Sequence, residues 1–150
     1  MSYDLMVFDP AKVPDGPTAF FAWYDADADA EADTAAAGDM FEDYSDPAQT
    51  MPLLRAWFLE MIKEFPAMNG AYAPDLDELE QTERAADYFI KKESIYIAFS
   101  WSDPGAAYEA TFRLAAKHGA GFLDASGDGS VWLPESPGKL KMAFRDPESS

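Results

Sequence analysis

The 150-residue sequence contains no cysteine, which excludes disulfide bonds, thiolate chemistry and cysteine-based zinc sites. It contains one histidine, so a metal site built on two histidines is excluded as well. Basic residues are scarce, because 11 lysines and arginines stand against 28 aspartates and glutamates, a formal net charge of −17. Such a chain repels phosphate backbones and anionic lipid, so we expect neither nucleic acid nor a membrane as partner.

Long hydrophobic runs are also missing. The most apolar stretch, residues 51–62, is interrupted by Pro52, Arg55 and Glu60, whereas a membrane helix needs about 20 apolar residues. The N-terminus carries Asp4 and no basic residue ahead of its short apolar run, unlike a secretory signal peptide. We therefore expect a soluble, cytoplasmic protein.

What the sequence does contain is enough apolar material for a folded core. Hydrophobic residues make up 48% of the chain and aromatic residues 15%, which is too much for a disordered protein. The length suits one domain. Alternating and helical hydrophobic patterns predict strands at 3–8, 88–90, 94–101, 121–125 and 130–133, and helices at about 17–28, 52–65 and 104–118.

This order of elements predicts a single α+β domain over residues 1–133, with a mainly antiparallel sheet of about five strands backed by three helices. Residues near 25–46 are predicted to be an acidic insertion. Residues 134–150, with three prolines, are predicted to be a loosely ordered tail.

The negative charge is concentrated in two segments. Residues 1–50 hold 12 acids and one lysine, a net charge of 1 − 12 = −11. A second acidic run follows near residues 75–83. We predict that these segments bind a basic partner, through Asp25, Asp27, Asp29, Glu31, Asp33, Asp39, Glu42, Asp43, Asp75, Asp77, Glu78 and Glu80.

The spacing of Asp25, Asp27 and Asp29 resembles the first half of a calcium-binding loop. The second half of that loop is missing, because Ala30 and Ala36 stand where the glycine and the bidentate glutamate belong. A solvated acidic face is the simpler interpretation, and we predict neither a metal nor a cofactor.

Signals for catalysis are weak. His118 falls in the last turn of a predicted helix, where a structural capping role is expected. None of the serines lies in a nucleophile-elbow sequence, so no catalytic residue is assigned. Glu60 lies between aromatic residues of a predicted core helix, and together with Trp57 and Trp101 it defines an alternative site, a groove for a small molecule or peptide.

Several blocks resemble a family of small uncharacterised bacterial proteins. They are MSYDLMVF at residues 1–8, LRAWFLEMI at 54–62, FPAMNG at 65–70 and LAAKHGAGF at 114–122. The resemblance spans most of residues 1–133 and implies a bacterial cytosolic single domain, without supplying a catalytic residue. In composition alone, the chain is similar to immunity proteins that neutralise basic bacterial toxins.

Three hypotheses follow. The first is a non-enzymatic acidic protein, an inhibitor or immunity protein, that binds a basic protein such as a toxin. The second, from another class, is a domain that binds a small molecule or peptide, and could be an enzyme, through the groove near Trp57, Glu60 and Trp101. The third is that the charge serves solubility alone. The sequence predicts no oligomeric state.

Overall fold

A computed structural model of the chain describes residues 3–14, 16–25, 50–67, 74–75, 77, 84–127 and 129–145. The elements in these ranges are β1 (Tyr3–Phe8), a helix at 17–25, α2 (Pro52–Glu64), β2 (Ala86–Ile90), β3 (Ser94–Phe99), α4 (Pro104–His118), β4 (Gly121–Leu123), β5 (Ser130–Ser136) and β6 (Lys139–Arg145). The strands form one antiparallel sheet in the order β2-β3-β1-β4-β5-β6. The predicted α+β fold with a mainly antiparallel sheet is therefore confirmed.

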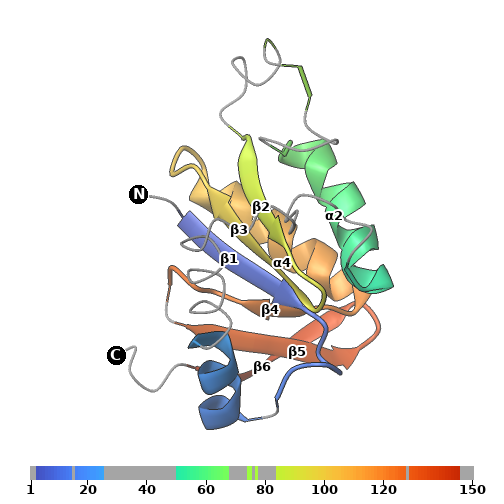
Figure 1. Ribbon diagram of the computed structural model, residues 1–150, viewed down its shortest axis with the longest axis vertical. Coiled ribbons are helices and arrows are strands. Elements are labelled where there is room, and N and C mark those ends of the chain that lie inside the picture. Colours follow the sequence, from blue (N-terminus) through green and yellow to red (C-terminus); the bar gives the residue numbers. More distant parts are fainter. Residues whose placement is uncertain are drawn as a thin grey trace, which may run out of the picture.

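The central strand β1 separates two apolar layers because successive side chains point to opposite faces of the sheet. Leu5 and Val7 are fully buried against α2 and α4 in the larger core. Met6 and Phe8 face the other way, where Phe20 from the helix at 17–25 covers them. In Figure 1 α4 lies behind the sheet and the blue N-terminal helix lies in front of it. The sheet is thus covered by helices on both faces.

Both helices of the larger layer begin and end where the sequence predicts. Pro52 and Pro104 stand in the first turn of α2 and α4, where the missing N–H costs nothing. The Asp103 side chain caps α4 by accepting a hydrogen bond from the backbone N–H of Ala106, and Gly119 ends it with a left-handed φ of 73°. None of the helices in the described residues is long and apolar enough to cross a membrane.

The C-terminal part differs from the prediction of a loose tail starting at residue 134. Strand β5 continues through Ser136, and residues 139–145 add β6 as an edge strand. Pro134 is tolerated because the β5–β6 register shifts between Pro134 and Ser136, an irregularity of the kind that accepts a residue without an N–H. Apolar Leu140 and Phe144 attach β6 to the two cores.

Candidate functional site

The structure describes three of the acidic residues predicted to bind a partner. Asp25, the last described residue of the N-terminal helix, is exposed, and so are Asp75 and Asp77. The other nine lie outside the described residues: Asp27, Asp29, Glu31, Asp33, Asp39, Glu42, Asp43, Glu78 and Glu80. The predicted partner surface is therefore described only in part.

The three residues of the predicted groove do not come together. Trp57 is fully buried, and its indole N–H donates to the backbone oxygen of Thr111 at 3.3 Å. Trp101 precedes α4, while Glu60 contacts Lys117 near the end of that helix. At 1.5 Å per residue, the 15 residues of α4 separate these two positions by roughly 20 Å.

Instead, Glu60 joins the two helices of the larger layer at the C-terminal end of α4. One carboxylate oxygen accepts from Lys117 Nζ at 2.6 Å, and the other lies 3.2 Å from His118 Nε2. These hydrogen bonds, from Lys117 first and His118 second, lower the pKa of Glu60. His118 on α4 therefore links this helix to α2 through Glu60. Sequence reasoning found both residues but not the pairing, because 58 positions separate them.

An open surface pocket of about 460 Å³ lies beside this pair. It is lined by residues 116–119 at the end of α4 and residues 134–138 around the β5–β6 turn. His118 borders it, with 17% of its side chain exposed. Glu60 is the hydrogen-bonding partner of the His118 ring among the described residues, so no nucleophile is aligned with this imidazole there.

Farther along the same helix layer, opposite charges are paired. Arg113 on α4 binds Glu64 on α2 at 2.6 Å and Glu109 at 2.9 Å, and these contacts raise the pKa of the Arg113 guanidinium. Arg84 binds Asp103 at 3.3 Å, and Lys139 binds Glu135 at 3.5 Å. The basic residues of the folded body are therefore often engaged by its own acids.

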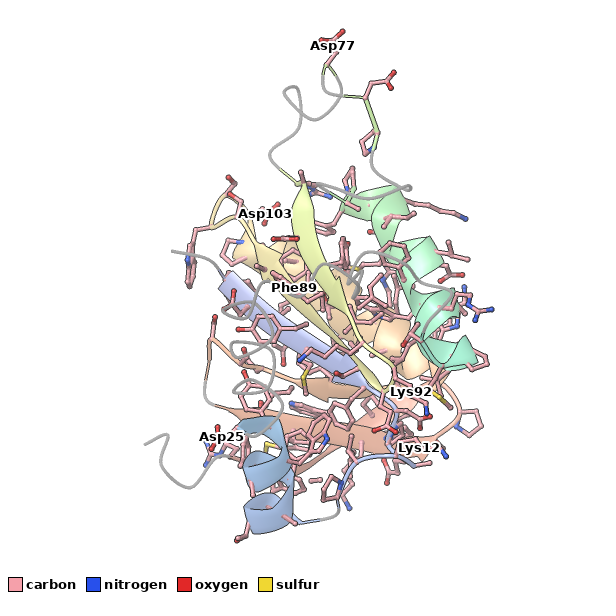
Figure 2. The ribbon with its side chains drawn as sticks, in the orientation of Figure 1. Lys12, Asp25, Asp77, Phe89, Lys92 and Asp103 are labelled. Carbon is pink, nitrogen blue, oxygen red and sulfur yellow. The ribbon has the colours of Figure 1, made fainter. Side chains whose placement is uncertain are left out.

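The two ends of the sheet differ in charge. At one end, Lys12, Lys91 and Lys92 meet where the β2–β3 turn contacts the residues after β1 through the Asp9 N–H to Glu93 O bond. We call this the lysine end. Figure 2 shows Lys12 and Lys92 close together there, with Asp77 and Asp103 toward the opposite end.

The opposite end, which we call the acidic end, contains the start of β1, the end of β3 and the start of α4. Its described acids include Asp4, Asp77, Asp103 and Asp124. The loop after β4 closes on β1 there, because the Ser126 N–H donates to the Asp4 backbone oxygen and the Asp4 N–H donates to Ser126 Oγ. Arg84 is paired with Asp103 at this end.

The charge excess is unevenly distributed along the sequence. All 11 basic residues lie in the described ranges, together with 13 of the 28 acids, so the net charge of those ranges is 11 − 13 = −2. The remaining 15 acids belong to the other residues, with no basic residue among them. The negative charge of the chain is therefore concentrated in particular segments of the sequence.

The described residues contain no group of three or more histidine, aspartate or glutamate side chains placed to hold a metal ion. Comparison with protein-family models, curated proteins and solved structures found no match to this chain. The site must therefore be interpreted from its own geometry. That geometry defines an α+β domain with a nearly neutral described body and strongly acidic segments.

Proposed function

We propose that this protein is an acidic, non-enzymatic binding protein that recognises a basic protein partner, as an inhibitor or immunity protein recognises a toxin. The observation that supports the proposal is the uneven distribution of charge along the sequence: residues 1–50 hold 12 acids and one lysine, and a second acidic run lies near residues 75–83. A charge that served solubility alone could be dispersed over the whole surface.

Concentrated charge has a physical consequence for binding. Complementary potentials steer a basic partner toward the acidic segments, accelerate encounter and disfavour acidic competitors. The described residues contribute little to that steering, because their net charge is only −2. Arg113, Lys117 and Lys139 are paired with acids on α2 and β5. The partner is therefore a protein with a basic surface, and the contacts include the segments around residues 25–46 and 75–83.

The first experiment measures association with the product of the adjacent gene at low and at high salt. Tight binding that weakens with salt is expected, because exposed charges are screened beyond about 10 Å at 0.1 M ionic strength. Binding that is absent, or indifferent to salt, would refute the proposal.

A pair of charge-matched variants sharpens this test. Replacing Asp27, Asp29 and Asp33 by asparagine removes three charges from the acidic segment. Replacing Glu93, Glu109 and Glu135 by glutamine removes the same number from the described body. The first variant should associate more slowly, whereas the second should keep the rate of the unchanged protein. Equal losses of association rate in the two variants would mean that binding depends only on the total charge of the protein.

The pocket beside His118 favours a second candidate function, the binding of a small molecule or peptide. Its supporting observation is the position of an imidazole held by a carboxylate at the border of an open 460 Å³ pocket. Ser136→Trp should fill this pocket and abolish any ligand-induced shift of the Gly119 and Gly138 amide signals in a fragment screen. Shifts unaffected by Ser136→Trp would place the ligand elsewhere.

A further inference from the structure

Three large apolar side chains are exposed among the described residues, and they lie on different parts of the molecule. Leu59 is on α2 and is 38% exposed, Met142 is on the edge strand β6 and is 45% exposed, and Trp101 is 48% exposed. Trp101 alone of the three belongs to the acidic end, because it lies between the end of β3 and the Asp103 cap of α4. Tryptophan is among the residue types enriched in the energetic hot spots near the centre of protein interfaces.

The Trp101 indole is supported from behind by a row of rings. Its centroid is 5.1 Å from that of Tyr3, Tyr3 is 6.4 Å from Phe99, and Phe99 is 5.3 Å from Phe65. Arg84 closes the row over the Phe65 ring at 5.2 Å while it binds Asp103. Tyr3 and Phe99 are buried, so the row is fixed in the sheet. An indole held in this way loses little freedom on binding.

The charge around this indole favours a cation. Asp103 follows Trp101 by two residues. Asp124 lies near Tyr3, since its charge is the second cause, burial being the first, of the raised pKa of the Tyr3 phenol. Asp77 is exposed toward the same end of the molecule (Figure 2). The lysines of the lysine end are gathered at the opposite end of the sheet.

We propose that Trp101 is the central contact of a docking surface for an arginine-rich or lysine-rich segment of a protein partner. A guanidinium or ammonium group would lie over the indole face, where the ring quadrupole attracts it, and neighbouring basic residues would meet the acids of this end. The inference rests on the proposed function and adds to it the surface used and the chemistry of the bound segment.

The experiment follows the indole N–H signals by nuclear magnetic resonance while a nona-arginine peptide is added. Trp101→Phe identifies the Trp101 signal. The expected result is a saturable shift of that signal, with the Trp57 signal unchanged because its N–H is bound inside the core. Shifts that never saturate, or that avoid Trp101, would overturn the inference.

Affinity for the adjacent gene product provides the second arm, with controls matched in exposure. Trp101→Ala should weaken binding at least about tenfold, whereas Leu59→Ala and Met142→Ala should leave it unchanged. Circular dichroism checks that each variant is folded. Trp101→Phe keeps an aromatic ring and should therefore lose less affinity than Trp101→Ala.

The outcomes separate the two proposals. Salt-sensitive binding that is equal in all three alanine variants overturns the role of Trp101 and leaves the proposed function standing. A loss of affinity in Leu59→Ala or Met142→Ala, but not in Trp101→Ala, also overturns the role of Trp101. The docking surface would then lie on α2 or β6. Failure of both the peptide and the gene product to bind overturns the proposed function, and the inference with it.

Discussion

At the scale of single residues, two glycines illustrate how local surroundings decide the effect of one methyl group. A Cβ at Gly121, in β4, would overlap the ring of buried Phe8, whereas a Cβ at Gly105, in the first turn of α4, would meet nothing within 4 Å. Gly121→Ala should therefore lower the free energy of unfolding by about 1–3 kcal/mol through overpacking. Gly105→Ala should raise it by roughly 0.5–1 kcal/mol, because alanine favours the helix.

Urea unfolding of both variants checks this pair. Because the substitutions are chemically identical, a similar effect at the two positions would contradict the packing of β4 against Phe8. The close approach of Gly121 to an aromatic ring could not be predicted from the sequence, which places this glycine at the start of a predicted strand but does not show which side chain faces it.

At the scale of elements, the start of α4 depends on one side chain. Asp103 Oδ1 accepts from the backbone N–H of Ala106 at 3.2 Å, and Oδ2 binds Arg84 at 3.3 Å. Asp103→Ala removes both contacts and should lower the free energy of unfolding by about 1 kcal/mol. Asp103→Asn keeps the cap and loses only an exposed ion pair, so it should lower the free energy of unfolding by much less than Asp103→Ala.

Asp75→Ala is the control, since Asp75 is exposed in the described structure and lies in neither α2 nor α4. Chemical denaturation compares the three variants. If asparagine and alanine at position 103 had equal effects, the ion pair with Arg84 rather than the cap would be the stabilising contact.

The elements that the sequence predicts well are those with both a pattern and a terminal signal. Helix α4 has an aspartate cap, a proline in its first turn and a closing glycine, and α2 has a continuous apolar stripe ending before Pro66. Strand β6 was missed because its lysines and neighbouring prolines resemble a tail. The alternation of Leu140, Met142 and Phe144 with Lys139, Lys141, Ala143 and Arg145 is the signal that was available.

The candidate sites were less predictable than the fold, for a physical reason. Contacts within one helix follow from spacing along the sequence, but the pairing of Glu60 with His118 depends on how α2 and α4 pack. The burial of Trp57 agrees with its place on the apolar stripe of α2, but its contact with the Tyr88 ring depends on how α2 packs on the sheet.

At the scale of the whole molecule, the buried phenols of Tyr3 and Tyr88 and the partly buried phenol of Tyr96 connect the sheet to both of its layers. Burial, and then the charge of Asp124, raises the pKa of Tyr3 to about 12. Burial is also the main cause of the raised pKa of Tyr88, and the charge of Glu64 is the second cause. The pKa of Tyr96 is raised first by burial and second by its hydrogen bond to Asp4. The Tyr88 hydroxyl donates to the backbone oxygen of Phe65, so these phenols are built into the fold as neutral groups.

The fold should therefore be sensitive to alkali. A tyrosine in the unfolded chain loses its proton near pH 10, while in the folded protein Tyr3 keeps it to about pH 12. The contribution of these tyrosines to stability should be constant below about pH 10 and should fall as the pH rises toward 12, because the folded state holds more protons than the unfolded chain. The slope should approach about 1.4 kcal/mol per pH unit for each such tyrosine.

Unfolding curves at successive pH values should show a smaller slope for Tyr3→Phe, which has one phenol fewer, and the same slope in both proteins would refute this account. The direction also suits the charge of the chain, since each tyrosinate adds to a net charge that is already −17 and increases repulsion within the fold.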